Sequence, residues 1–190
     1  MLNIGVLALQ GSVIEHINAL NKIPEVNAIE VKKTGQLDNI DGLILPGGES
    51  TTISKLLHIF GLFEPLKNKI QNGMPVWGTC AGMILLANKI IGETEHLGVM
   101  DITVRRNAYG RQLDSFNCSA HIPEFGDKKI PLIFIRAPWI EEVGAKAMAV
   151  HIHNSHIIAA KQNNMLVTAF HPELTDDLTV HKYFTDMCKK

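Results

Sequence analysis

Cysteine, aromatic residues and net charge are all scarce in this 190-residue sequence. Three widely spaced cysteines, Cys80, Cys118 and Cys188, argue against a disulfide framework and favour a reducing, cytoplasmic setting. A formal net charge of −1 argues against general attraction to nucleic acid or to an anionic membrane surface. Since the sequence also lacks a membrane-length apolar run, a CxxC pair and zinc-ligand spacing, we predict no membrane segment, metal or cofactor.

The first half of the chain alternates short apolar runs with helical periods. We expect strands at 2–9, 28–31, 42–45 and 76–79, with helices at 13–22, around Leu56–Phe60 and around Leu66–Ile70. This alternation predicts an α/β fold with an open, three-layer, mixed but mostly parallel sheet and helices on both faces. Functional groups then belong at the carboxyl ends of the strands. The length and the absence of a linker predict one domain, 1–190.

The second half is richer in strand patterns. Short strands are expected at 102–104, 132–135, 148–152, 157–161 and 166–170, with a hairpin turn at 162–164 and a closing helix at 178–187. Residues 107–131 have the weakest pattern, and we expect loops or an extension of the sheet there.

The segment 75–88 has the pattern of a nucleophile elbow. Gly78 and Gly82 flank Cys80, after a short apolar strand and before an apolar, helix-compatible run at 83–88. The glycines fit because a strained strand-to-helix turn crowds its neighbours two residues away. The helix N-terminus would favour a thiolate at Cys80, and the backbone N–H of Ala81 could bind an oxyanion. The alternative is a buried structural cysteine in a glycine-rich turn.

A catalytic cysteine needs a base, and a base needs an orienting group. His171-Pro172-Glu173 follows the last expected strand, and Pro172 favours an extended neighbour, so Glu173 could reach the His171 ring from the same side. This leaves the other ring nitrogen for Cys80, which completes a triad. A surface His-Pro turn is the alternative.

Other strand ends carry groups suited to a substrate. The Gly47-Gly48 turn could supply backbone N–H groups for an oxyanion, or it could be a plain turn with Ser50 or Thr51 as helix cap. Arg105, Arg106 and Arg136 suit a carboxylate, with surface charge as the alternative. A metal cluster at His151, His153 and His156 is less favoured than exposed neutral histidines.

Taken together, these residues resemble the class I (triad) glutamine amidotransferases, and among them the glutaminase subunits of pyridoxal 5′-phosphate synthases. The resemblance runs from the first strand to the last helix. The segments that carry it are Leu7–Gly11 with Glu15-His16, Leu45–Thr52, Gly78–Gly82, Arg106–Gln112, Phe134–Pro138 and Phe170–Asp176. Asn117 departs from the family pattern, where an acidic residue is expected.

The resemblance implies a flavodoxin-like fold and hydrolysis of L-glutamine to glutamate and ammonia through a glutamyl thioester. It implies that Cys80 is the nucleophile, His171 moves protons and Glu173 orients His171. The implied glutamine-binding residues are Gly48, Glu49, Ser50, Arg106, Ile135 and Arg136, and the implied oxyanion donors are Gly47, Gly48 and Ala81.

The resemblance also implies a partner, the synthase subunit that makes pyridoxal 5′-phosphate and receives the ammonia. We expect Gln10–Ser12 and the first helix, with Glu15 and His16, to take part in docking. The alternatives are an amidotransferase for another synthase, such as imidazole glycerol phosphate synthase, or a non-catalytic subunit with the same fold.

Overall fold

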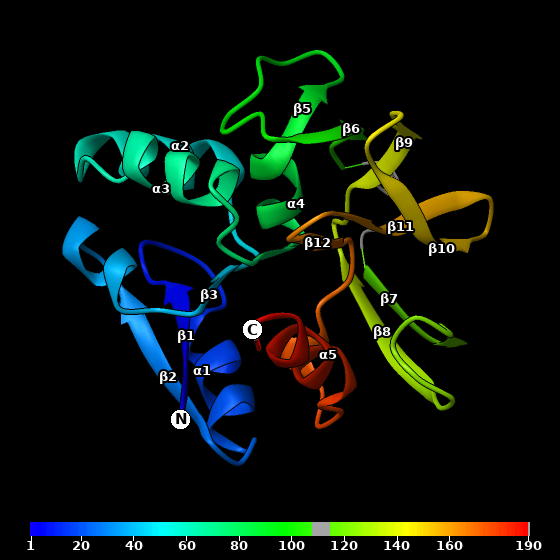
Figure 1. The fold of residues 1–190 in the computed structure, drawn as a ribbon. Coiled ribbons are helices and arrows are strands. Elements are labelled where there is room, and N and C mark those ends of the chain that lie inside the picture. Colours follow the sequence, from blue (N-terminus) through cyan, green and yellow to red (C-terminus); the bar gives the residue numbers. More distant parts are fainter. Residues whose placement is uncertain (108–114, 190) are drawn as a thin grey trace.

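A mixed sheet forms the centre of the molecule (Figure 1). The computed structural model describes residues 1–107 and 115–189, and in that part the sheet has ten strands, in the order β2-β1-β3-β4-β12-β11-β9-β6-β5 with β10 on β11. Its parallel half consists of β1 (Leu2–Leu7), β2 (Val26–Val31), β3 (Gly42–Leu45), β4 (Val76–Thr79) and β12 (Met165–Thr168). Strands β3, β4 and β12 are buried along their whole length, as expected where helices cover both faces.

The other half is mainly antiparallel. It consists of β5 (Ala87–Ile90), β6 (Met100–Arg105), β9 (Trp139–Val143), β10 (Met148–His153) and β11 (His156–Gln162). A separate antiparallel pair, β7 (Ser115–His121) and β8 (Lys129–Ile135), projects beside it. The expected hairpin between β11 and β12 is confirmed.

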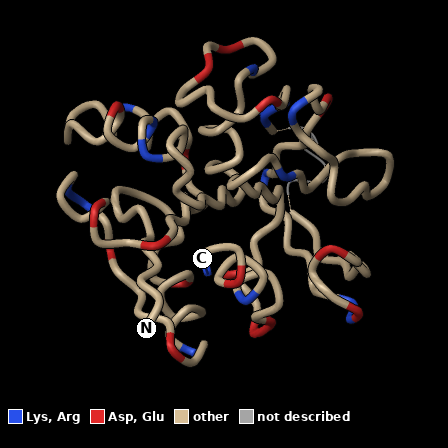
Figure 2. The backbone as a smooth tube through the Cα atoms, viewed as in Figure 1, with Lys and Arg blue, Asp and Glu red and all other residues tan. Residues whose placement is uncertain are grey.

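Helices cover both faces of the parallel half, which confirms the predicted three layers. Helices α1 (Val13–Asn21) and α5 (Thr179–Met187) lie on one face, and α2 (Ser50–Ile59), α3 (Phe63–Gln71) and α4 (Ala81–Leu86) on the other (Figure 1). The described residues also form two short 3-10 helices, η1 (Thr34–Asp38) and η2 (Pro172–Leu174). Charged residues lie mainly toward the outside, while the tube through the central strands is largely tan (Figure 2).

Three local expectations differ from the structure. The helix after Cys80 ends at Leu86, because residues 87–90 turn into strand β5 on β6. Glu49, rather than Ser50 or Thr51, caps α2, since its carboxylate accepts the N–H of Thr52 at 2.9 Å. The described part of the weakly patterned stretch includes β7 and the start of β8. These two strands form a small sheet of their own rather than an extension of the main one, and in it Asn117 lies opposite Ile133.

Candidate active site

Cys80 lies on a strained turn between β4 and α4. It has φ 49° and ψ −100°, a left-handed conformation that a residue with a side chain rarely adopts. Its backbone N–H donates to the Thr168 carbonyl oxygen at 2.8 Å, which ties the turn to the end of β12. A strained cysteine between a buried strand and a helix is the geometry that the elbow pattern predicts.

The two flanking glycines are needed for close backbone contacts. A Cβ on Gly78 would lie 2.5 Å from the Gly82 carbonyl atoms, and one on Gly82 would lie 2.1 Å from the Leu45 carbonyl oxygen. The Gly82 carbonyl belongs to α4 and the Leu45 carbonyl to β3, so neither can move without disturbing that helix or strand, and the steric reason for the glycines is confirmed. The turn is thereby held against β3 as well as β4.

His171 and Glu173 come together directly after the buried strand β12. His171 Nδ1 and Glu173 Oε1 are 2.7 Å apart, and both residues are buried. The link is made by the 3-10 turn η2 with Pro172 at its start, whereas we expected an extended chain at this point. A Cβ on Gly47 would meet both the His171 ring and the Cys80 Cβ, so all three residues converge at the carboxyl ends of β3, β4 and β12.

The electrostatics of this group favour an ion pair. Burial alone would lower the pKa of His171, but hydrogen bonds and charge from Cys80 and Glu173 raise it to about 10. Burial would likewise raise the pKa of Glu173, but His16, His171 and Ser12 lower it to about 2. A protonated His171 between the anionic Glu173 and the side chain of Cys80 is an arrangement in which a cysteine can act as a nucleophile.

A pocket of about 410 Å³ opens in front of Cys80. Its lining contains every residue that the sequence assigned to the glutamine and oxyanion sites, together with the expected nucleophile and base: Gly47, Gly48, Glu49, Ser50, Cys80, Ala81, Arg106, Ile135, Arg136 and His171. Glu173 lies behind His171 and outside the pocket lining. The pocket thus joins strand ends from both halves of the sheet.

Arg106 is held at the pocket by two carboxylates. Its guanidinium donates to Glu49 Oε1 at 2.8 Å and to both oxygens of Glu93 at 2.7 and 2.8 Å. Burial would raise the pKa of Glu49, but hydrogen bonds from Thr51 and Thr52 lower it to about 2, so Glu49 stays anionic. The sequence predicted Arg106 and Glu49 in the site but gave no sign of Glu93, whose contact depends on the turn after β5.

The loop after β1 contacts the site more closely than the sequence indicated. Gln10 Oε1 accepts the N–H of Glu49 at 2.8 Å, and Ser12 Oγ donates to Glu173 Oε1 at 2.7 Å. Glu15 is exposed, as a docking role requires, but His16 is completely buried behind Glu173, so the expectation that His16 lies on a docking surface is wrong. His16 lies on the same buried face of α1 as Ala19 and Leu20.

The remaining candidates lie away from the pocket. His151 and His153 are on β10, and the His156 ring stacks on Trp139. Among residues 1–107 and 115–189, no group of three or more His, Cys, Asp or Glu side chains could hold a metal ion. Burial raises the pKa of the Cys118 thiol, and raises that of Cys188 to about 12. The part of the Arg106–Gln112 segment after Asn107 lies outside the described residues.

Comparison with known proteins agrees with this geometry. Residues 6–190 match the SNO glutamine amidotransferase family. The chain belongs to that family. It is 52% identical to the pyridoxal 5′-phosphate synthase subunit PdxT of Ruminiclostridium cellulolyticum, over 98% of this chain and 100% of that one. The PdxT of Streptomyces avermitilis is also 52% identical, over 98% of this chain and 94% of the relative.

The solved structures extend the family match to the fold. A crystal structure of a glutamine amidotransferase superposes with a TM-score of 0.91 at 38% identity, over 97% of this chain and 98% of that one. A putative GMP synthase protein from Thermoplasma acidophilum, with a TM-score of 0.70 at 17% identity over 99% and 94% of the two chains, shares the fold. No helix in the described part of this amidotransferase is both long and apolar enough to cross a bilayer.

Proposed function

We propose that this chain hydrolyses L-glutamine to L-glutamate and ammonia, with Cys80, His171 and Glu173 as the catalytic triad. The observation that carries the proposal is the strained Cys80 at the mouth of a pocket, beside a histidine whose far nitrogen lies 2.7 Å from a buried carboxylate. We also propose that residues 1–190 act as a single amidotransferase domain.

The first half-reaction forms a thioester. The Cys80 thiolate attacks the side-chain amide carbon of glutamine, and the C–S bond forms as the carbonyl oxygen becomes an oxyanion. The His171 imidazolium then gives its proton to the amide nitrogen, the C–N bond breaks, and ammonia leaves. Glu173 holds the ring with Nε2 toward the reacting atoms and stabilises its positive charge.

The second half-reaction regenerates the thiolate. Neutral His171 takes a proton from a water molecule, whose oxygen attacks the thioester carbon. The C–S bond breaks and glutamate leaves. Since every proton and electron pair moves among substrate, water and the triad, the cycle needs no cofactor.

Backbone N–H groups of the Gly47-Gly48 turn and of Ala81 would stabilise the oxyanion in both half-reactions. The support for this role is their place in the pocket lining, around Cys80. The Gly47 carbonyl oxygen accepts the N–H of Ser12 at 3.0 Å, which fixes that side of the turn.

The charged groups of the pocket suit an amino acid. Arg106 and Arg136 would bind the α-carboxylate, and the anionic Glu49 would face the α-ammonium group, while Gly48, Ser50 and Ile135 complete the contact surface. Arg136 has φ 42°, a left-handed conformation that directs this segment at the end of β8 into the pocket lining.

The ammonia would pass to the synthase subunit that makes pyridoxal 5′-phosphate, in a hetero-oligomeric complex in the cytoplasm. The support is the name of the relatives, each belonging to a pyridoxal 5′-phosphate synthase, which this chain matches over nearly its full length. The loop 10–12 and exposed residues of α1 such as Glu15 would take part in docking, because this loop contacts the pocket.

Glutamate release from glutamine, with and without the synthase subunit, tests the proposal. We expect release that rises strongly with the partner and is absent for Cys80→Ala, which should still bind the partner. A rate of glutamate release that does not change when the synthase subunit is added would contradict the proposed supply of ammonia to that subunit. No release by a folded complex would contradict the proposed glutaminase activity.

A further inference from the structure

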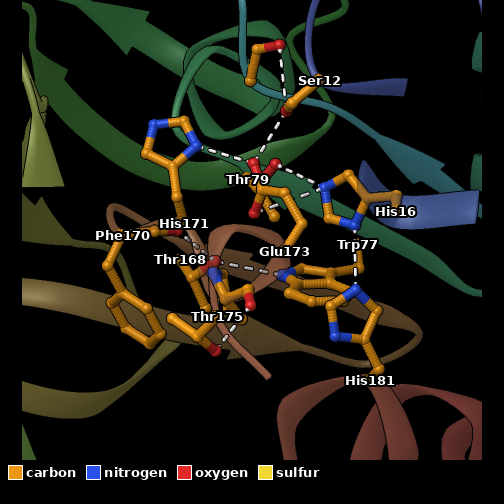
Figure 3. Close-up of polar contacts among 12 residues, drawn as sticks. Ser12, His16, Trp77, Thr79, Thr168, Phe170, His171, Glu173, Thr175 and His181 are labelled. Atoms are coloured by element: carbon orange, nitrogen blue, oxygen red, sulfur yellow. Dashed lines mark hydrogen bonds and ion pairs between the residues drawn. The ribbon is translucent and has the colours of Figure 1, made fainter. Parts of the chain in front are cut away.

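Behind the triad lies a buried polar group that the proposed reaction does not use. Glu173 Oε1 is engaged by His171 and by Ser12, whereas Glu173 Oε2 is buried and has no hydrogen-bond partner among the described residues. The polar atom that faces Oε2 is His16 Nε2, at 3.6 Å (Figure 3). A buried carboxylate oxygen without a compensating donor is costly, so the state of His16 matters to the triad.

His16 is in turn held by a second buried histidine. His16 Nδ1 and His181 Nε2 are 3.0 Å apart, and His16 Nε2 lies 3.2 Å from Thr79 Oγ1. Trp77 packs edge-on against both rings, at centroid distances of 5.4 and 5.0 Å, and so restricts their rotation. His16 lies on α1 and His181 on α5, while Thr79 is the last residue of β4 and directly precedes Cys80 (Figure 3).

Burial keeps both histidines neutral, because it lowers the pKa of His16 and lowers that of His181 to about 3. Two neutral rings that share one contact need one donor and one acceptor. If His16 Nδ1 donated, its Nε2 lone pair would face a carboxylate oxygen. His181 would then carry its proton on Nδ1, which is buried without a partner in the described structure.

The opposite assignment avoids both penalties. With the proton on His181 Nε2 donated to His16 Nδ1, His16 carries its own proton on Nε2, between Thr79 Oγ1 and Glu173 Oε2. The unpartnered His181 Nδ1 is then a bare acceptor, which costs less to bury than an unpaired donor. The donors run in one direction, from His181 to His16 and on toward Glu173.

We propose that His16, fixed in its Nε2–H tautomer by His181, is a positioning residue that holds Glu173 against His171 and so maintains the mutual orientation of the triad residues. This inference rests on the proposed glutaminase function. His16 touches no substrate, so its loss should lower kcat through the orientation of His171 and leave the KM for glutamine unchanged. The role extends the triad inward by two residues, from the first and the last helix of the chain.

Steady-state glutamate release by the full chain in complex with the synthase subunit tests this role. We expect His16→Leu, which removes the donor, to lower kcat by about 10- to 100-fold with KM unchanged. His16→Gln keeps an N–H group near the position of Nε2 and should recover most of the activity. His181→Leu leaves His16 free to change tautomer and should cause a smaller loss of kcat.

Phe184→Leu is the matched control. Phe184 is buried on α5 and packs near Trp77 at a centroid distance of 5.8 Å, but it is apolar and donates no hydrogen bond to the chain of histidines. It should lose stability without losing kcat. Circular dichroism and thermal unfolding check that each variant is folded. If His16→Leu does not fold, the kcat of His181→Leu is the test of the role.

Wild-type kcat in a folded His16→Leu, or in His181→Leu if the former does not fold, would overturn the inference. So would a kcat for His16→Gln as low as that for His16→Leu together with an equal loss in Phe184→Leu, because packing alone would then explain both. A wild-type complex that releases no glutamate would instead overturn the proposed function, and the inference with it.

Discussion

The two halves of the sheet contribute different parts of the site. The parallel half, with its fully buried strands, supplies Cys80 after β4, His171 after β12 and the Gly47-Gly48 turn after β3. The mainly antiparallel half and the β7–β8 pair supply Arg106 after β6 and Arg136 after β8, and both of these strands alternate between buried and half-buried residues. The proposed triad residues and the Gly47-Gly48 turn thus follow fully buried strands, whereas the two arginines proposed to bind the α-carboxylate follow strands that are partly open to solvent.

This division predicts that changes in the parallel half affect chemistry and stability, and changes in the other half affect substrate binding. Cys80→Ala should have the largest effect. It removes the proposed nucleophile, and we expect glutamate release to fall by at least about a thousandfold. Cys80→Ser would be a useful second variant, and appreciable turnover by Cys80→Ala would contradict the mechanism.

Gly82→Ala tests the rigidity of the same half. Its Cβ would lie 2.1 Å from the Leu45 carbonyl oxygen, so the turn or β3 must shift, and we expect a loss of about 3 kcal/mol in the free energy of unfolding. Gly35→Ala is the control, since a Cβ there would meet nothing within 4 Å beyond its chain neighbours. Chemical denaturation of both variants measures the difference, and equal stabilities would show that the elbow tolerates a side chain.

Arg106→Ala probes the other half. Loss of a charged hydrogen bond to substrate should raise the KM for glutamine by about 10- to 100-fold, with a smaller change in kcat. Arg105→Ala is the control, because Arg105 precedes it in sequence but is exposed and pairs with Glu141 outside the pocket. A kcat effect larger than the KM effect would contradict the division of roles between the halves.

The pH dependence of stability should give the smallest effect. His181 has a pKa of about 3 when folded, lowered by burial, whereas an unfolded histidine titrates near 6.5. The unfolded chain therefore binds a proton that the folded chain does not, so this stability is present above about pH 6.5 and is lost as pH falls. We expect His181 to contribute a slope of ~1.4 kcal/mol per pH unit between about pH 6 and 4.

Denaturant unfolding of wild type and His181→Gln over that range measures this slope. The variant should have a shallower acid dependence by about one proton. His171 acts in the opposite direction, because its raised pKa gives stability that is present below about pH 6.5 and is lost as pH rises toward 10. An unchanged acid slope in the variant would show that His181 is not a buried neutral ring.

The sequence predicted the parallel half well, for a physical reason. Strands buried on both faces appear as continuous apolar runs, and the expected 42–45 and 76–79 match β3 and β4. Strands β5, β7 and β9 were missed, because they mix apolar with polar residues, and β9 contains Glu141 and Glu142.

The same distinction applies to the site. Local motifs identified Cys80, His171 and the Gly47-Gly48 turn as candidate site residues, because the elbow and turn patterns consist of residues that are adjacent in the sequence. Ser12, His16 and Glu93 reach the site only through the fold, and Ser12 contacts Glu173 across 161 positions of sequence. Sequence reasoning placed His16 on a docking surface, since a polar residue on the first helix gives no sign of being buried.

Covalent labelling tests the central claim most directly. The folded chain, in complex with the synthase subunit, would be treated with a glutamine-mimicking electrophile and mapped by mass spectrometry. The account predicts one label, on Cys80, that L-glutamine suppresses, while Cys118 and Cys188 stay unmodified although Cys118 is the more exposed thiol. Labelling of Cys118 in preference to Cys80, or labelling of Cys80 that glutamine does not suppress, would contradict a glutamine site at the elbow.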